Sequence, residues 1–188
     1  LSNDYLSYSY DIRSYCFDLD NNLWYTKYNL DTYTSSLIKM NRYGECQNIS
    51  GDSDIFAVDL KYDPVTNKIW FVDFNTSDLG YVNVLDNTLS LIAGTNVRIG
   101  YYDEFGIDAY GKIWYFANGT TIGYPQTPAP VGRLFRFDPD TETSTLIANT
   151  DYSFNLTFNS SKTKIWFVSS TTLKTVDVLT MNMIVITV

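Results

Sequence analysis

The sequence contains no histidine, and it is poor in several other residue types on which enzyme and nucleic-acid chemistry depends. It has two cysteines, and its 13 Lys and Arg against 21 Asp and Glu leave a formal net charge of −8. Without histidine, proton transfer near neutral pH falls to Asp and Glu. No Ser or Cys nucleophile stands next to a plausible base, and no Gly-rich phosphate loop is present. A hydrolase that uses carboxylates and a metal is the catalytic chemistry left open.

Clustered basic residues and long apolar runs are also missing. Phosphate binding needs grouped Lys and Arg, so we do not expect a nucleic-acid partner. No window approaches 18 consecutive apolar residues, so we expect no membrane span. The chain begins with Leu, without an initiator Met or a signal-like segment, and we expect a processed or excised piece of a longer product.

The two cysteines, Cys16 and Cys46, stand 30 residues apart. A disulfide between them would stabilise the fold by about 3 to 4 kcal/mol on the loop-closure model. Two buried free thiols are an equally good interpretation of the sequence.

Aromatic and small polar residues are abundant. Aromatic residues make up 16% of the chain and hydrophobic residues 45%, which is ample for a core. Asn-x-Ser/Thr sequons, the acceptors of N-linked glycans, begin at Asn48, Asn75, Asn118, Asn155 and Asn159. The sequons and a composition rich in Tyr, Asn, Thr and Ser favour an extracellular, glycosylated protein on a cell or virion surface.

One phrase occurs four times, as NNLWYTKYN (21–29), NKIWFVDFN (67–75), GKIWYFANG (111–119) and TKIWFVSST (163–171). Its tryptophans, Trp24, Trp70, Trp114 and Trp166, are 46, 44 and 52 residues apart. A period of this size is typical of propellers and solenoids. A turn residue stands six or seven positions before each Trp, at Asp18, Asp63, Asp108 and Asn159.

Further strands follow each Trp strand. We predict third strands at 36–40, 79–85, 132–137 and 173–179, and fourth strands such as 88–94 and 144–149. No apolar pattern has the helical period of 3.6 residues, so we expect almost no helix. Each unit is then a four-stranded antiparallel meander, with apolar alternation at Phe56, Val58, Leu60 and Tyr62.

A meander of about 45 residues cannot bury both of its faces alone, and radial stacking of such units gives a β-propeller. We therefore predict an all-β fold in one β-propeller domain at 1–188. Its four blades lie at about 8–50, 54–94, 97–149 and 151–188, after an amino-terminal arm at 1–7. The blades either close as a four-bladed ring, which we prefer, or form part of a larger propeller.

Each Trp is predicted to fill the same core position between neighbouring sheets, since apolar residues flank it. Burial of such a ring stabilises by roughly 2 to 3 kcal/mol. The alternative is a row of exposed tryptophans that grip sugar rings.

The phrases GIDAYGKIWYFANG (106–119) and GRLFRFDPDTETSTLI (132–147) resemble the repeat of virginiamycin B lyase-like propellers and of the gluconolactonase or senescence-marker family. The resemblance covers all four units and implies the propeller fold more than an activity. The lyase chemistry of that family relies on a His, which this chain lacks.

In the lactonase-like enzymes a divalent cation sits in the central channel, and the resemblance implies one ligand position eleven residues before each Trp. Here that position holds Arg13, Asp59, Asp103 and Asn155. Asp59, Asp103 and Asn155, joined by Glu104, would suit Ca²⁺. The family's neighbouring Pro and Gly are absent, and an ion-pair network of Arg13, Asp59, Lys61 and Asp103 explains the same residues without a metal. A channel position could not carry a glycan, so Asn155 has at most one of these roles.

The segment NGTTIGYPQTPAPVG (118–132) is about ten residues longer than its counterparts. Three prolines, Pro125, Pro128 and Pro130, stiffen it, and Tyr124 would anchor a partner. We expect it to be the contact surface, against the alternative of an inert insertion. The Tyr-rich segment 3–11 would pack on the ring or pair with another chain's edge.

Two functions fit the sequence. The first is a secreted or surface-displayed, non-catalytic binding or assembly module of a cell envelope, filament or virion, with a protein or glycan partner or self-association. The second is a metal-dependent enzyme of the lactonase or lyase kind with a cation in its channel.

Overall fold

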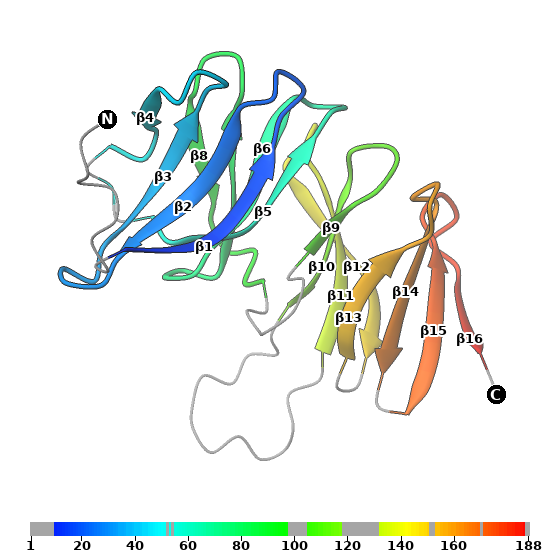
Figure 1. The fold of residues 1–188 in the computed structure, drawn as a ribbon. Coiled ribbons are helices and arrows are strands. Elements are labelled where there is room, and N and C mark those ends of the chain that lie inside the picture. Colours follow the sequence, from blue (N-terminus) through cyan, green and yellow to red (C-terminus); the bar gives the residue numbers. More distant parts are fainter. Residues whose placement is uncertain are drawn as a thin grey trace. The chain divides into compact units, whose positions relative to one another are not determined.

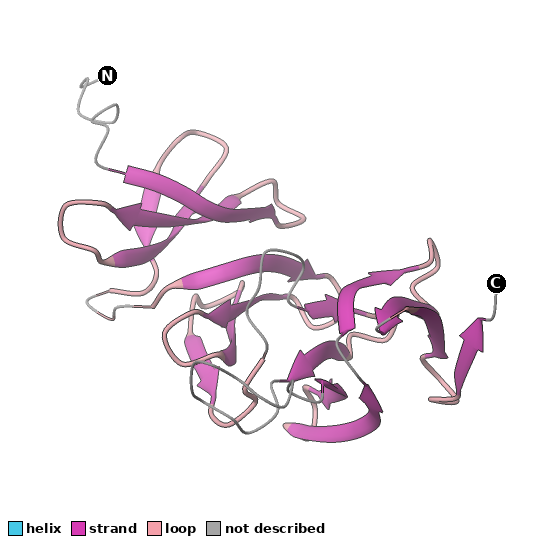
Figure 2. Cartoon of the chain, turned by 90° about the horizontal axis from the view of Figure 1, so that it is seen from below, coloured by secondary structure: helices cyan, strands magenta, loops and turns pink. Residues whose placement is uncertain are grey.

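The computed structural model describes residues 10–51, 53, 55–97, 105–117, 132–150, 153–169 and 171–186, with the backbone alone at 153–155. Within these residues the regular structure is all strand, and no helix is present (Figure 2). The strands form four antiparallel sheets of four, each in sequence order (Figure 1). This arrangement confirms the predicted all-β fold of four four-stranded meanders, which we call blades 1 to 4.

The chain divides into two compact units, Leu1–Leu91 and Ile92–Val188. The first unit holds blades 1 and 2. Their strands are β1 (Tyr10–Phe17), β2 (Leu23–Asn29), β3 (Ser35–Met40), β4 (Cys46–Asn48), β5 (Ala57–Asp63), β6 (Lys68–Asp73), β7 (Asp78–Asn83) and β8 (Leu89–Ile92), the last of which ends one residue past the division.

The second unit holds blades 3 and 4. Their strands are β9 (Phe105–Ile107), β10 (Ile113–Ala117), β11 (Gly132–Asp138), β12 (Thr143–Thr150), β13 (Ser153–Phe158), β14 (Lys164–Ser169), β15 (Thr172–Asp177) and β16 (Met183–Ile186). The predicted third strands agree with β3, β7, β11 and β15 to within two residues at each end. The single-domain prediction for 1–188 stays a prediction.

The predicted turn residue ends the first strand of every blade. Asp18 and Asp108 each accept two backbone N–H groups of their turn through Oδ1, and Asn159 does the same through its Oδ1. Asp63 accepts the N–H groups of Val65 and Thr66. One residue of each turn has a positive φ, namely Asn21 (61°), Asn67 (53°), Gly111 (73°) and Lys162 (53°). These side-chain bonds reverse the chain before the Trp strand.

The spacing between the turn residue and the Trp decides what else the turn residue binds. At a spacing of six, the indole N–H of Trp24 donates to Oδ2 of Asp18 at 2.9 Å, and that of Trp114 donates to Oδ2 of Asp108 at 2.8 Å. We call these two contacts the Asp–Trp clasps. At a spacing of seven, Oδ2 of Asp63 accepts the hydroxyl of Thr66 in blade 2.

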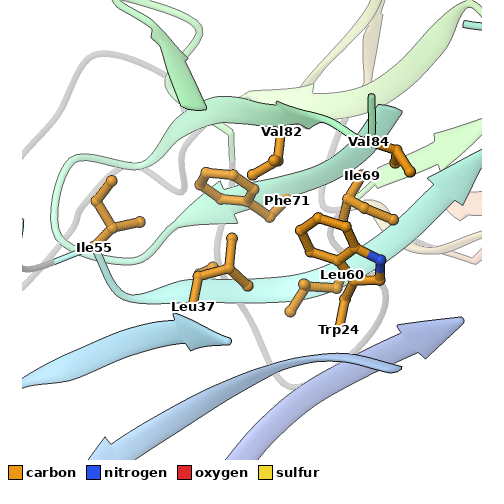
Figure 3. Close-up of a cluster of buried hydrophobic side chains, with 9 residues drawn as sticks. Trp24, Leu37, Ile55, Leu60, Ile69, Phe71, Val82 and Val84 are labelled. Atoms are coloured by element: carbon orange, nitrogen blue, oxygen red, sulfur yellow. The ribbon is translucent and has the colours of Figure 1, made fainter. Parts of the chain in front are cut away.

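A continuous core joins the two blades of the first unit (Figure 3). Trp24 and Leu37 project from blade 1 toward Ile69, Phe71 and their neighbours in blade 2. Trp24 and Phe71 are fully buried. Burial of a ring of this size stabilises by roughly 2 to 3 kcal/mol, which makes the junction between the sheets the main apolar contact of the unit.

Hydroxyl groups add polar bonds across the same junction. Thr26 Oγ1 donates to the carbonyl oxygen of Ala57 at 2.6 Å, and Ser35 Oγ donates to that of Ile55 at 2.7 Å. The N–H of Leu60 donates to Ser14 Oγ at 2.8 Å. Each bond satisfies a backbone group at the sheet junction, so the two blades are fixed in register as well as buried together.

The second unit has an equivalent core. Trp114, Phe116 and Leu134 of blade 3 meet Leu156, Ile165, Phe167, Val176 and Val178 of blade 4. The rings of Phe116 and Phe167 are in edge contact, with centroids 5.4 Å apart. Gly106 lies under Phe158 and Leu156 of blade 4, and a Cβ there would collide with both side chains.

The predicted core role of the tryptophans holds for three of the four. Trp24, Trp70 and Trp114 are fully buried, whereas Trp166 is only partly buried. Trp166 lies on the face of blade 4 that is turned away from blade 3, where the described residues do not cover it completely.

The disulfide predicted between Cys16 and Cys46 does not form, and both thiols are free. Cys16 is on β1 and Cys46 on β4, the two edge strands of one sheet. Three strand spacings of about 4.8 Å put the two residues about 14 Å apart, well beyond the roughly 7 Å limit between the Cα atoms of a disulfide. Both thiols are free, as the alternative held, but they are not both buried as it predicted, since Cys16 is partly buried and Cys46 is exposed.

Candidate functional site

The positions predicted to face a central cation coincide with irregularities in the first strands. The register of β1 shifts between Ile12 and Ser14, that of β5 between Val58 and Lys61, and that of β13 between Phe154 and Thr157. The residues inside these shifts include Arg13, Asp59 and Asn155, and Asp59 has a positive φ of 54°. A β-bulge redirects a side chain and is common beside active sites, so these three residues are candidates for binding a ligand or a metal ion.

The bulge in β5 also changes which residues face the core. Ala57 and Leu60 are both in the core of the first unit, although strict alternation would put them on opposite faces. The predicted alternation from Phe56 to Tyr62 is therefore interrupted at Asp59.

Two of these bulge residues form ion pairs within their own strands. Lys61 Nζ donates to both carboxylate oxygens of Asp59, at 2.7 and 2.9 Å. Arg13 Nε lies 3.1 Å from Oδ2 of Asp11, and its guanidinium group lies 5.3 Å from the centre of the Tyr28 ring. An ammonium group on both oxygens of Asp59 competes with a cation for the same carboxylate.

The predicted metal site is only partly within the described residues. Asp103 and Glu104 lie outside them, and of Asn155 only the backbone is described. Within the described part of the chain, no group of three or more Cys, Asp or Glu side chains is placed to hold a metal ion. Calcium binding by Asp59, Asp103, Glu104 and Asn155 stays a prediction.

The buried carboxylates have structural partners. Asp18, Asp63, Asp73 and Asp108 are at most 5% exposed. Burial raises the pKa of Asp18, but hydrogen bonds from the Trp24 indole, the side chain and backbone of Asn22 and the backbone of Asp20 lower it more, so its net pKa lies below the ordinary value of 3.8. Asp18 therefore stays ionised at neutral pH, as an acceptor within the fold and not as an acid for catalysis.

A polar recess of about 390 Å³ lies on blade 1, lined by Asn22, Lys39, Asn41, Glu45, Cys46 and Gln47. Most of its polar groups already have partners. Lys39 Nζ bonds Asn87 at 3.2 Å and lies over the Trp24 ring, and Asn41 Nδ2 bonds Glu45 at 2.6 Å. A ligand here would have to displace these contacts.

The predicted binding loop lies outside the described residues, including Tyr124, Pro125, Pro128 and Pro130. The same holds for Asn118. Of the other predicted glycosylation sites, Asn48 and Asn75 are exposed. The amide of Asn159 donates to Ser161 and Thr163 and its carbonyl oxygen caps the turn, so a glycan there would compete with these bonds.

Sequence reasoning missed an exposed apolar surface on blade 1. Cross-strand pairing puts a set of large apolar side chains on the face that is turned away from blade 2, namely Tyr10, Ile12, Tyr15, Phe17, Leu23, Tyr25, Ile38 and Met40. Ile12, Tyr15 and Phe17 are 58%, 65% and 56% exposed. We call this surface the outer face of blade 1. Its signal in the sequence is YDIRSYCF, where Tyr10 and Ile12 stand at even positions and Tyr15 and Phe17 at odd ones. The bulge at Arg13 brings all four to the same face.

Blade 4 has a corresponding surface on the face turned away from blade 3. It carries Trp166, Val168, Leu173, Ile184 and Ile186, which we call the outer face of blade 4. Val168 and Ile184 are 40% and 59% exposed. Exposed apolar sheet faces of this kind mark interaction sites.

No protein-family model and no curated protein sequence matches the chain. Solved structures do. An oligogalacturonate lyase in complex with manganese has a TM-score of 0.69 at 12% identity, over 93% of this chain and 52% of its own. A nidogen/laminin complex has a TM-score of 0.60 at 13% identity, over 90% of this chain and 61% of its own. A gluconolactonase from Xanthomonas campestris has a TM-score of 0.58 at 11% identity, over 90% of this chain and 59% of its own.

These structures are β-propellers, and with the four meanders they show that the chain has the propeller fold. Identities this low show the fold alone. The chain spans between about half and three fifths of the length of these proteins. None of the described residues forms a helix that could cross a membrane.

Proposed function

We propose that the protein is a non-catalytic binding and assembly module, secreted or displayed on a cell, filament or virion surface. The outer face of blade 1 carries this proposal. It keeps Ile12, Tyr15 and Phe17 of β1 more than half exposed, on a face where a soluble sheet ordinarily has polar residues. Such a face gains free energy when a protein partner covers it.

The bonding of the acidic residues supports the same proposal. The carboxylate of Asp59 is occupied by Lys61, and Asp18 and Asp108 accept the indole N–H of the Asp–Trp clasps. These carboxylates therefore stabilise the fold. An enzyme would need free carboxylates to bind a metal ion or to transfer a proton. The exposed sequon at Asn75 fits a surface location.

A metal-dependent enzyme of the lactonase or lyase kind is the second candidate, and the bulges in the first strands favour it. They align Arg13, Asp59 and Asn155 at one level of their blades. Manganese in the oligogalacturonate lyase structure belongs to that protein, and a cation in this chain is a separate hypothesis.

Thermal melting with and without divalent ions separates the two candidates. A calcium site of micromolar affinity at millimolar Ca²⁺ would add about 4 kcal/mol of stability, equivalent to roughly 8 to 16 °C in Tm for a chain of this length. The binding module is expected to melt unchanged with Ca²⁺, Mn²⁺ or chelator, and to leave lactone substrates intact. A large shift that Asp59→Ala removes, with turnover of a lactone, would establish the enzyme instead.

Intact mass of the protein secreted from eukaryotic cells tests the location. A glycan on Asn75 is expected, and Asn75→Gln should lose it. Asn48 pairs with Ile38 on the outer face of blade 1, where a glycan would oppose the binding of a partner, so Asn48→Gln should leave the glycan mass unchanged. A secreted chain of unmodified mass would count against the surface assignment.

A further inference from the structure

Within each unit, the two blades meet by the same arrangement of side chains. The Trp of the earlier blade projects toward the later one, as Trp24 does toward blade 2 and Trp114 toward blade 4. The later blade contributes to the same core the two residues on either side of its own Trp. These are Ile69 and Phe71 in blade 2, and Ile165 and Phe167 in blade 4. A blade junction therefore has a Trp half and a flanking-pair half.

The outer face of blade 1 carries a flanking-pair half of such a junction, and the outer face of blade 4 carries a Trp half. On blade 1, Leu23 and Tyr25 flank Trp24 and lie on the outer face, in register with Phe17 and Tyr15 of β1. On blade 4, Trp166 lies on the outer face, in register with Thr175 of β15 and, through it, Ile184 of β16. Trp166 is partly exposed, whereas the three other tryptophans are fully buried.

A second observation on blade 4 points to a missing contact. The side chain of Thr175 is 6% exposed, and its hydroxyl has no hydrogen-bond partner within the described residues. At the junction of blades 1 and 2, the buried hydroxyls of Thr26 and Ser35 each donate to a carbonyl oxygen of the facing blade. A buried hydroxyl without a partner costs about 1 to 3 kcal/mol, and a facing blade could supply a partner once the groups that now cover Thr175 Oγ1 have moved.

We propose that the outer face of blade 4 docks on the outer face of blade 1 of a second copy of this chain. This inference rests on the assembly function proposed above and names its partner. Trp166 of one copy then packs against Leu23 and Tyr25 of the other, beside Tyr15 and Phe17. The contact is heterologous, because different surfaces of the two copies meet, and it either closes into a ring or continues as a filament.

A second copy carries both faces. Closure of the four blades of one chain into a ring would use the same two faces, and it is the outcome of the test below in which the chain stays monomeric. Each copy carries both halves of the junction, and both halves have the composition of the junctions already buried inside the units.

Sedimentation velocity of the full chain tests the proposal across about 1 to 100 µM, the range in which modest interfaces associate. The wild-type chain is expected to form dimers or larger species as concentration rises. The double variant Tyr15→Ser/Phe17→Ser removes one face, and Trp166→Ala removes the other. Each is expected to raise the dissociation constant about 100-fold or more.

Mixing the two variants identifies the heterologous geometry. Each variant retains the face that the other has lost, so one intact junction remains between them. The mixture is expected to give a heterodimer, although neither variant associates alone. An interface that joins identical faces would give none, and that result would overturn the proposal.

Leu85→Ser is the matched control, since Leu85 is 82% exposed and lies on neither outer face. It should associate as the wild type does. If Trp166→Ala fails to fold by circular dichroism, the double variant Val168→Ser/Ile184→Ser replaces it on the same face.

A wild-type chain that stays monomeric at every concentration would overturn the inference. So would association that is unchanged in the Tyr15→Ser/Phe17→Ser variant. Either result would leave the binding function standing on its own tests, since the enzyme alternative is decided by the metal-dependent melting and the lactone assay.

Discussion

At the scale of single residues, Asp18 shows how one side chain organises a turn and a core residue together. It accepts two backbone N–H groups, the amide of Asn22 and the indole of Trp24. The sequence predicted the turn from the residue type. It did not predict the indole bond, because that bond depends on the fold of the Trp strand back over the turn.

We expect Asp18→Ala to lower the free energy of unfolding by about 2 to 4 kcal/mol, because it leaves the buried Trp24 N–H and the turn N–H groups without their acceptor. Asp20→Ala is the matched control in the same turn, since Asp20 is exposed, and should stay within about 0.5 kcal/mol. Urea unfolding followed by Trp fluorescence measures both. Equal losses in the two variants would contradict the role of the clasp.

The two cysteines are expected to differ in reactivity. Burial, and then the negative charge of Asp18, raise the pKa of the Cys16 thiol to about 12. Cys16 therefore stays protonated at pH 8, whereas the thiol of Cys46 is exposed. A thiol reagent should modify one group rapidly and the second only after denaturation, and Cys46→Ser should remove the rapid phase. A protein with no reactive thiol in denaturant would contain the disulfide after all.

At the scale of elements, the sequence predicted the strands well because each carries its own local signal. The Trp phrase, the turn residues before it and the third strands are all in place. The bulges at Arg13 and Asp59 could not be predicted, because they follow from pairing with the neighbouring strand. The apolar outer face of blade 1 was missed for the same reason. Strict alternation would put Tyr10 and Ile12 on one face of the strand and Tyr15 and Phe17 on the other, and only the bulge at Arg13 brings them together.

The hydroxyl bonds between blades 1 and 2 give a test at this scale. Thr26→Val keeps the shape of the side chain but removes the donor to the Ala57 carbonyl, and we expect a loss of about 1 to 2 kcal/mol in unfolding free energy. Thr32→Val, on an exposed turn, is the control and should be nearly neutral. Urea midpoints at constant slope report the difference. A neutral Thr26→Val would mean that water replaces the donor without cost.

Gly106 provides a second test between blades. Gly106→Ala would put a Cβ against Phe158 and Leu156, and we expect about 1 to 3 kcal/mol of destabilisation from overpacking. Phe158→Leu in the same chain should recover part of that loss by making room. A Gly106→Ala protein as stable as wild type would show that Phe158 moves aside freely.

At the scale of the whole molecule, the pH dependence of the free energy of unfolding follows from the absence of histidine and from the carboxylates whose pKa values are lowered in the folded state. The pKa of Asp138 is lowered, first by the hydrogen bond from Lys112, and that of Asp177 first by the N–H of Thr180. With Asp18, these groups have folded-state pKa values below 3.8. Their stabilisation is complete above the unfolded value and is lost as the pH falls through the lower folded values.

We therefore expect a stability plateau from about pH 5 to 8, where no side chain of this chain ordinarily titrates, and a steep loss below about pH 3.8. Urea midpoints between pH 2.5 and 8 measure the profile. Asp18→Asn should flatten the acid limb. A step near pH 6.5 would contradict the expectation, since no histidine is present to produce it.

The spacing from turn residue to Trp also bears on how the chain arose. It runs six, seven, six, seven through the four blades, and the Asp–Trp clasps fall in blades 1 and 3. The repeat therefore has a period of two blades, which matches the two compact units. Duplication of a two-blade ancestor would produce this alternation of spacing. The turns themselves agree in blades 1 and 3 but differ between blades 2 and 4, where the positive φ falls four residues after the turn residue at Asn67 and three after it at Lys162.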